Sequence, residues 1–471
     1  MMKIFKSYKN TGRVLAMASL MAVSFGLHAA IPGIESNTIE LWAKSGQIPT
    51  PDGDSLRIWG FARSATGEAE YPAPTIIVDE GDIVNVTVHN VDVPQAVSLV
   101  FPGQGLISKT CDIPGAPQPT GLNPNRNGCW GNASTSGTDV IPADDAGVHS
   151  ITYTFTAAKP GTYLYQSGVS PQIQADMGLV GAMIVRPSMV ATNVDATGGV
   201  AYNDSTTAYD QEYLFFLSEM DPKLHYLAEH GGIDQWDNSE YRSVLFFING
   251  RNAPDTLAPD NYPYLHHQPL GSLVIMKPGQ RILLRVLNPG RSQHPLHLHG
   301  NHYDQIARDG NLLSTTTREG NTGFSDYTLN SVPGSTQDLI FNWTGEGMGW
   351  DIHNSESPHG TCVSGVGGDD AVNNRTGAGT PDGFHDTTWE YCADHGNPLP
   401  VVLPESQDLG FGGFYGGSPY LGDVGSLPVG EGGLNPWGGM VFMWHSHSER
   451  ALTNNDIFPG GMLTMMIVVP R

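Results

Sequence analysis

Short segments in which apolar and polar residues alternate recur along the chain. Clear examples are 38–43, 56–61, 82–90 and 148–155, and most are bounded by Gly, Pro, Asn or Asp. A period of two residues is typical of β-strands with one buried face, whereas long helix-like periodicity is hard to find here. The pattern therefore predicts an all-β protein built from sandwiches.

The same pattern divides the chain into two units. Strand-like segments fill 38–190, and after a polar connector at 191–210 they begin again and extend over 211–471. Two segments, 80–90 and 278–288, each consist of a Gly turn followed by an alternating strand that ends in Asn. This similarity favours an internal repeat of one sandwich.

One long stretch, from about 345 to 440, lacks strand periodicity and is rich in Gly, Asp and Asn, so we interpret it as an insertion in the second unit. The chain has four cysteines: Cys111 and Cys129 in one loop-like stretch, and Cys362 and Cys392 in the insertion. None has a histidine at metal-ligand spacing in a strand-like context. We interpret them as two local disulfides, although four cysteines allow three connectivities.

The first 30 residues have the layout of a secretory signal. Basic residues precede an apolar stretch at 14–27, and the small residues Ala29 and Ala30 follow. The apolar stretch is shorter than the ~20 residues that a membrane span needs, and no other stretch is long and apolar enough. We predict a periplasmic or secreted protein without a membrane span in the mature chain; a retained membrane anchor is the alternative.

Charge narrows the classes of partner. The 471-residue chain has 23 Lys and Arg against 47 Asp and Glu, and a net charge of −24. The signal holds four of the basic residues and none of the acidic ones, so the mature chain has 19 − 47 = −28. Such a surface repels nucleic acid and anionic lipid. The sequence also lacks a Ser-His-Asp triad pattern, a phosphate-binding Gly loop and a dinucleotide fingerprint, and it identifies no catalytic residue.

The candidate chemistry lies in two histidine motifs. The first motif contains His294, His297 and His299, and the second contains His445 and His447. Residues i and i+2 of a strand point to the same face, so each His-x-His pair aims two imidazoles in one direction. Two such strands side by side would bring four imidazoles together, a ligand set that suits Cu, Zn, Fe or Ni. An odd spacing from His297 places His294 nearer the opposite face.

With these motifs the chain resembles the multicopper oxidase family of cupredoxin-fold proteins. The resemblance covers most of the mature chain outside the insertion. It is carried by His294-Pro-Leu-His-Leu-His-Gly300, by Ile248-Asn-Gly-Arg251, and in the first unit by the strands around Glu80-Gly-Asp82, 160–165 and 178–185. The resemblance implies two cupredoxin-like Greek-key β-sandwich domains, copper as cofactor and oxidoreductase activity.

The family has a type 1 copper, held by one Cys, two His and usually a Met, and a trinuclear cluster held by eight His. Carried over residue by residue, His294 matches a type 1 ligand and His297 a type 2 ligand. The type 3 ligands are matched by His299, His445 and His447. The resemblance therefore implies a metal site in the second domain that involves these five histidines.

Most of the family's other ligands are absent. Ser446 stands where the type 1 thiolate belongs, and Ala451 stands where the second type 1 His belongs, although Met462 matches the axial position. A serine hydroxyl stays protonated at neutral pH and is a weak ligand. In the first domain, four other residues stand at the positions of the two His-x-His pairs: Val100, Pro102, Gln166 and Gly168. Association of subunits cannot restore a cluster whose first-domain ligands are missing from every copy, and the oligomeric state stays open.

We therefore predict a multicopper-oxidase-like protein that binds copper, one ion, at the His-x-His pairs of its second domain, without the ligands for the family's four-copper chemistry. Whether it is an enzyme stays open. The alternatives are an oxidoreductase that uses a mononuclear copper site, and a metal-free scaffold or interaction protein in which the histidines are a relic. We interpret His266, His267 and His302 as surface or strand-end residues, and His225 and His230 as solvated residues.

Overall fold

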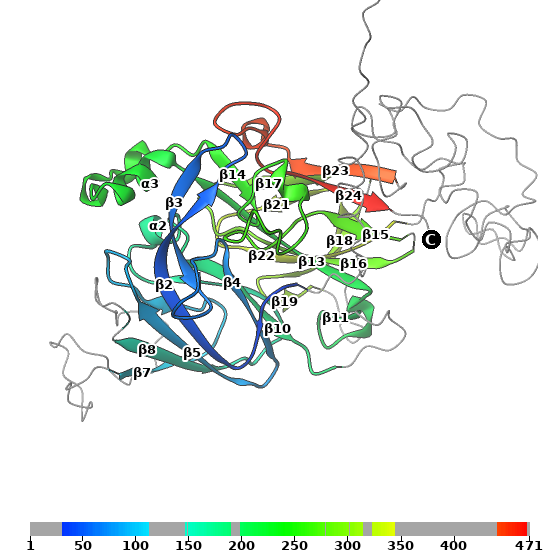
Figure 1. Cartoon of the computed structure of the whole chain (residues 1–471). Coiled ribbons are helices and arrows are strands. Elements are labelled where there is room, and N and C mark those ends of the chain that lie inside the picture. The colour runs from blue at the N-terminus through cyan, green and yellow to red at the C-terminus, as the bar shows by residue number, and fades with distance from the viewer. Residues whose placement is uncertain are drawn as a thin grey trace, which may run out of the picture.

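The computed structural model describes residues 31–112, 147, 149–189, 198–277, 279–300, 302–313, 323–343 and 440–468. Figure 1 shows these residues as two β-sandwiches packed side by side. The prediction of an all-β fold is confirmed, because the described residues form mainly strands with few and short helices. No helix among them is long and apolar enough to cross a membrane.

The first sandwich has two sheets of five strands each. One sheet has the order β1-β4-β10-β9-β6, and the other has the order β3-β2-β5-β8-β7. Period-2 burial in β5 matches the alternation in the sequence, since every second residue is buried. The strands are β1 (Ile34–Glu35), β2 (Thr38–Pro49), β3 (Ser55–Ala62), β4 (Ala73–Asp79), β5 (Ile83–Asn90), β6 (Leu99–Val100), β7 (Ser108–Asp112), β8 (Ser150–Thr156), β9 (Gly161–Ser167) and β10 (Val180–Arg186).

The second sandwich has one sheet in the order β14-β13-β16-β22-β18-β19, to which β20 adds beside β18, and one in the order β15-β24-β23-β17-β21. Its strands are β13 (Gln211–Met220), β14 (Leu245–Ile248), β15 (Val274–Met276), β16 (Arg281–Leu287), β17 (His294–Leu298), β18 (Tyr303–Arg308), β19 (Asn311–Leu312), β20 (Phe324–Asp326), β21 (Thr328–Ser331), β22 (Thr336–Asn342), β23 (Met440–Ser446) and β24 (Leu463–Val468).

The pairing pattern is the same in both sandwiches. Strand β5 lies parallel to β2 and antiparallel to β8, as β16 lies parallel to β13 and antiparallel to β22. In the facing sheets, the order β4-β10-β9-β6 matches the order β15-β24-β23-β17, and the parallel and antiparallel senses agree. The repeat predicted from 80–90 and 278–288 is therefore a repeat of the whole sandwich topology.

The structure describes residues 198–210 of the expected connector. A short hairpin of β11 (Gly199–Val200) and β12 (Ala208–Tyr209) encloses η1 (Ser205–Thr207) and buries Tyr202 and Tyr209. These rings pack in one apolar cluster with Leu283 and Ile340 of the second sandwich. The remaining helical elements are α2 (Pro171–Gln174), α3 (Pro222–Glu229), η2 (Ile233–Gln235), η3 (Asn238–Glu240), η4 (Asp255–Leu257) and η7 (Glu449–Leu452).

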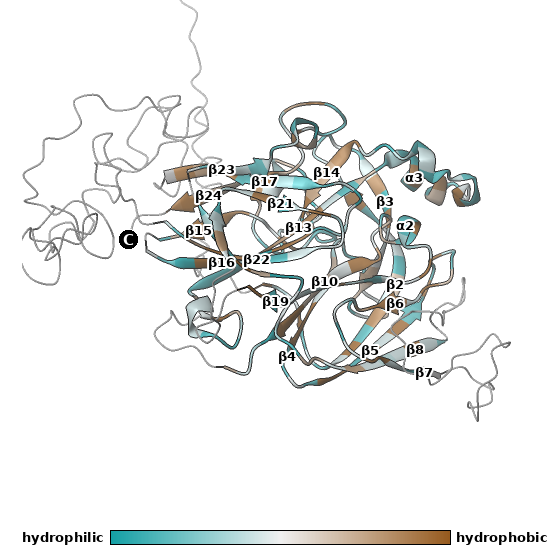
Figure 2. Cartoon of the chain, turned by 180° about the vertical axis from the view of Figure 1, so that it is seen from behind, coloured by the Kyte–Doolittle hydropathy of each residue, from teal (hydrophilic) through white to brown (hydrophobic). Residues whose placement is uncertain are grey.

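Apolar strand residues form the core of each sandwich and also the contact between them (Figure 2). In β24 all six residues are buried, as expected for a strand covered on both faces. A third apolar cluster joins residues of both sandwiches, among them Leu164 and Ile184 on one side and Leu214 and Phe216 on the other.

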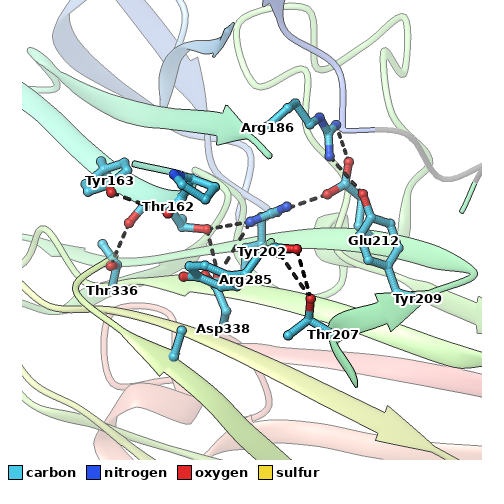
Figure 3. Close-up of polar contacts among 12 residues, drawn as sticks. Thr162, Tyr163, Arg186, Tyr202, Thr207, Tyr209, Glu212, Arg285, Thr336 and Asp338 are labelled. Atoms are coloured by element: carbon cyan, nitrogen blue, oxygen red, sulfur yellow. Dashed lines mark hydrogen bonds and ion pairs between the residues drawn. The ribbon is translucent and has the colours of Figure 1, made fainter. Parts of the chain in front are cut away.

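A buried polar network lies beside that contact (Figure 3). The guanidinium of Arg285, which is fully buried, donates to Glu212 Oε2 at 2.9 Å and to Thr162 Oγ1 of the first sandwich at 2.9 Å. Thr162 Oγ1 in turn donates to Asp338 Oδ1 at 2.6 Å, and Arg186 of the first sandwich pairs with Glu212. Buried charges are stable only when they are paired and hydrogen-bonded, so the two sandwiches depend on each other here.

Candidate metal centre

Strands β17 and β23 place the two histidine motifs side by side. They pair antiparallel, with His297 directly opposite His445 and Leu298 opposite Trp444. Residues 294, 296 and 298 of β17 are buried and the intervening residues are partly exposed, so His297 lies on the outer face of the sheet. The predicted alternation is confirmed, because Leu296, Leu298 and Trp444 belong to the core on the other side.

The imidazoles of both motifs form one cluster. The ring centroids of His297 lie 5.0 Å from His299, 5.6 Å from His445 and 5.1 Å from His447, and those of His445 and His447 are 5.3 Å apart. One pair of ring nitrogens is in direct contact, since His299 Nε2 and His445 Nε2 are 3.0 Å apart. A single ion held by all four residues would require the rings of His297 and His447 to turn toward that pair.

Hydrogen bonds fix how two of these rings carry their protons. His445 Nδ1 lies 2.9 Å from the carbonyl oxygen of Ser446, which can only accept. Nδ1 of a neutral His445 therefore holds the proton, and Nε2 has the free lone pair that a metal ion needs. His299 Nε2 must then donate to His445 Nε2 in the metal-free protein. His297 Nδ1 is held by the hydroxyl of Thr328 at 2.7 Å.

The cluster favours neutral imidazoles. Desolvation lowers the pKa of His299 to about 4, and the neighbouring His445 and His297 add to this effect. Desolvation also lowers the pKa of His445 and that of His297, where His447 contributes next. Neutral imidazole is the form that binds metal ions, so these residues are in the ligand state at neutral pH.

His294 lies on the opposite face from this cluster, as its spacing predicts. It is buried, and its Nε2 lies 2.8 Å from Oε2 of the buried Glu219. Its Nδ1 is buried without a hydrogen-bond partner. No sequence motif marks Glu219, which is 75 residues away on β13. The structure therefore separates His294 from the other four candidate ligands.

The residues expected around a type 1 copper do meet in space. Ser446 N donates to Met462 O at 3.0 Å, and Met462 N donates to Ala451 O at 2.7 Å. All three residues are buried, and Ala451 and Met462 are part of the apolar core. With a methyl group and a hydroxyl in place of imidazole and thiolate, this position lacks the soft ligands that a blue copper needs.

The first sandwich has the matching strand pair without the histidines. Strands β6 and β9 pair with Val100 opposite Gln166, which repeats the register of His297 opposite His445. The topological repeat thus supports the assignment of Val100 and Gln166 to ligand positions. An aliphatic side chain and an amide do not form a transition-metal site, so the residues present there do not fit a trinuclear cluster.

Other histidines differ from their predicted environment. The prediction that His225 is solvated is wrong: this residue of α3 is fully buried, its Nδ1 bonds to the carbonyl of Arg57, and its Nε2 lies 3.8 Å from buried Asp176. Helix α3 places Leu224 in the core of the first sandwich, and that packing also buries the adjacent His225. His302 is exposed as predicted and packs on Tyr327.

Several predictions fall outside the described residues. These are the signal at 1–30, the insertion at about 345–440 apart from its last residue, and the cysteines Cys129, Cys362 and Cys392. Only the backbone of Cys111 is described, in β7. The disulfide assignment therefore stays a prediction.

Comparisons with known proteins agree with this architecture. Residues 241–353, which include β17 and its first histidine motif, match the family model of multicopper oxidase. The chain is 26% identical over 231 residues to the iron transport multicopper oxidase FET3 of Gibberella zeae, an alignment that covers 49% of this chain and 29% of that protein. These matches support the resemblance to the multicopper oxidase family, with the family model covering residues 241–353. The chain matches less than a third of the length of this curated relative.

Two solved structures share the fold. The crystal structure of the blue copper oxidase from Nitrosomonas europaea superposes with a TM-score of 0.50 at 17% identity, over 91% of this chain and 85% of that chain. The multicopper oxidase mgLAC gives a TM-score of 0.50 at 15% identity, over 93% of this chain and 86% of that chain. The family implies copper as a cofactor. Of its copper positions, the imidazole cluster on β17 and β23 is the one whose donor set fits this metal here.

Proposed function

We propose that this chain is an exported member of the multicopper oxidase family that binds one copper ion at His297, His299, His445 and His447. The proposal rests above all on the contact between His299 Nε2 and His445 Nε2, which lie 3.0 Å apart on paired strands. Two ring nitrogens at this distance share one proton when no metal is bound. Displacement of that proton by a metal ion leaves both lone pairs as ligands.

The chain's own groups support such a site. Desolvation keeps the imidazoles of His297, His299 and His445 neutral, so little proton release opposes metal binding at neutral pH. The Ser446 carbonyl and the Thr328 hydroxyl orient two of the rings. Copper bound there would supply Lewis acidity and one-electron redox chemistry. The partly exposed outer face of β17 leaves the cluster open to small molecules.

The family's oxidation with four coppers is not part of this proposal. The position of the type 1 copper has Ser446 and Ala451, and the first-domain side of the trinuclear cluster has Val100 and Gln166. Without a thiolate-bound copper there is no entry for single electrons, and without the first-domain imidazoles there is no site for three coppers. Metal binding, transport or assembly outside the cytoplasm is therefore favoured over oxidation of the family's kind.

Copper loading of the purified full chain tests this proposal. We expect about one tightly bound copper ion per chain by metal analysis after removal of free ion, without the strong blue absorption of a thiolate-bound copper. The double variant His297→Ala/His445→Ala should lose this copper. A matched control is His302→Ala, which removes an exposed imidazole that packs on Tyr327. Equal copper content in wild type and the double variant would refute the proposed site.

Activity assays then separate a binder from an enzyme. Oxygen uptake with phenols, Fe(II), Mn(II) or Cu(I) would be compared between the copper-loaded protein and the double variant. Turnover that depends on the four histidines would favour a mononuclear copper oxidoreductase. Copper binding without turnover is the result we expect. The location, periplasmic or secreted, rests on residues 1–30, and the mass of the mature chain tests it.

A further inference from the structure

We propose a second metal site, at the junction of the two sandwiches, formed by Glu68, His266 and His267. Glu68 lies between β3 and β4 of the first sandwich, and the two histidines lie between η4 and β15 of the second. Among the described residues, this is the one group of three or more His, Cys, Asp or Glu ligand atoms that all lie within 4.8 Å of one another.

The separations between the ligand atoms suit one small cation. Glu68 Oε2 lies 3.2 Å from His266 Nε2 and 3.8 Å from His267 Nε2. Ligand atoms about 2.0–2.2 Å from a tetrahedral ion are a little more than 3 Å apart, so small side-chain rotations would complete the site. Two imidazoles and one carboxylate, with water in the open position, form a donor set for a divalent transition metal such as Zn²⁺ or Cu²⁺.

The tautomer of His267 supports metal binding. Its Nδ1 lies 2.8 Å from the carbonyl oxygen of Ala69, which can only accept a hydrogen bond. The Nδ1 atom of a neutral ring therefore carries the proton, and Nε2 keeps the free lone pair. Metal-bound histidines usually have such a partner on the second ring nitrogen, because it fixes both the tautomer and the ring plane.

Both segments that contribute ligands are anchored in the protein interior. Tyr71 N donates to His267 O at 2.7 Å across the junction, and the Tyr71 ring is buried. The next residue, Gln268, is buried too, and its carbonyl accepts from Arg251 Nε at 2.9 Å and from Arg251 Nη2 at 2.7 Å. A site whose backbone is held this way loses little conformational freedom when an ion binds.

A simple ion pair between His266 and Glu68 is the competing explanation. The side chains of these residues are 57% and 67% exposed, and an exposed pair contributes little to stability. The ion pair also gives no role to His267. The side chain of His267 is only 17% exposed, and its Nε2 is aimed at the same carboxylate. A bound cation accounts for all three groups and would link the two sandwiches.

Titration of the full chain with Zn²⁺ tests this site. The protein that is titrated is the double variant His297→Ala/His445→Ala, which we call the parent. In this variant the imidazole cluster does not compete for Zn²⁺, so the outcome is independent of the function proposed above. We expect about one Zn²⁺ per parent chain by calorimetry at neutral pH, and loss of this binding on adding His267→Gln. Zn²⁺ should also raise the thermal midpoint of the parent but not that of the triple variant, because an ion that binds only the folded state stabilises it.

Substitutions of the other two proposed ligands, and of one control histidine, extend this test. His266→Gln and Glu68→Gln alter exposed side chains and should weaken Zn²⁺ binding while the midpoint without metal stays unchanged. The control is His230→Gln. His230 lies at the C-terminus of α3, where its exposed imidazole bonds to Tyr226 O, and its replacement should leave Zn²⁺ binding intact. A parent that binds no Zn²⁺, or binding unaffected by His267→Gln, would overturn the proposal.

Discussion

Single hydrogen bonds orient the imidazoles of the cluster, which are the candidate metal ligands. His297 projects from the outer face of β17. The Thr328 hydroxyl on the neighbouring β21 lies 2.7 Å from its Nδ1 and holds the ring in place. Groups of this kind orient metal ligands and raise their basicity, so a residue that never touches the metal can control its affinity.

Substitution of Thr328 tests this role. Thr328→Val removes the hydroxyl while nearly preserving the shape of the side chain, and should lower copper affinity about 10- to 100-fold. Thr328→Ser keeps a hydroxyl at the same position and should retain most of the affinity. Competition with a copper chelator measures both variants. Equal affinities for the Val and Ser variants would show that the hydrogen bond does not position His297.

At the scale of single residues, sequence reasoning predicted the placement of the candidate ligands better than it predicted their hydrogen-bond partners. The i, i+2 spacing is enough to place His297 and His299 on one face, because strand geometry fixes it. It also separates His294 from them. The partners Thr328 and Glu219 come from other strands, at sequence separations of 31 and 75 residues. Burial of His225 was missed for the same reason, since it depends on where α3 packs.

Strand register is what brings the two histidine motifs together. His297 faces His445 across β17 and β23, and in the first sandwich Val100 faces Gln166 across β6 and β9. A shift of one residue would turn either side chain to the other face. The first sandwich thus retains the backbone geometry of the site while lacking its imidazoles.

This equivalence predicts that imidazoles can be restored. Val100 and Gln166 are both partly exposed, so the double variant Val100→His/Gln166→His should fold and gain a weak two-imidazole site. We expect the double variant to bind additional Zn²⁺ or Cu²⁺ in equilibrium dialysis, and each single variant to bind no more than wild type. Additional binding by a single variant, or none by the double variant, would contradict the shared register.

The strands themselves were predictable where alternation was regular. Segments such as 82–90 and 280–288 became β5 and β16 with small changes at their ends. Strands β18 and β22 were not identified, and neither was helix α3. In β22, six consecutive residues are buried, including Thr336, Gln337 and Asp338, so no polar–apolar alternation marks it. Its polar residues are buried because they bond to other elements, which a local pattern cannot show.

The whole molecule depends on the polar junction between its sandwiches. Arg285 is fully buried and connects Glu212 to Thr162 of the first sandwich (Figure 3). Removal of Arg285 takes away the buried cation that Glu212 and Asp338 share, and leaves Arg186 as the one remaining partner of opposite charge for Glu212 among the described residues. Arg285→Met should therefore lower the free energy of unfolding by about 3–5 kcal/mol, measured by urea denaturation. Arg308→Met, at a half-exposed arginine, should change it by less than about 0.5 kcal/mol. Similar losses in the two variants would contradict this role.

The same junction predicts how stability changes with pH. Burial alone would raise the pKa of Glu212, yet the facing guanidiniums of Arg285 and Arg186 hold it below its ordinary value of 4.5. The unfolded chain therefore binds this proton at a higher pH than the folded protein does. The contribution of Glu212 to stability is fully present above pH 4.5 and is lost as the pH falls through the lower folded pKa.

Comparison of wild type with Glu212→Gln isolates this contribution from that of other carboxylates. The variant should be less stable at about pH 6, and the difference should be smaller at about pH 3, because below pH 4.5 the unfolded wild-type chain takes up a proton at Glu212 that the folded protein resists. Urea denaturation at both pH values measures the difference. Glu240→Gln is the control, because this exposed carboxylate pairs with Lys223 on the surface and should give a small difference at either pH. A Glu212→Gln difference that stays constant or grows in acid would mean that the carboxylate is not held ionised by the two arginines.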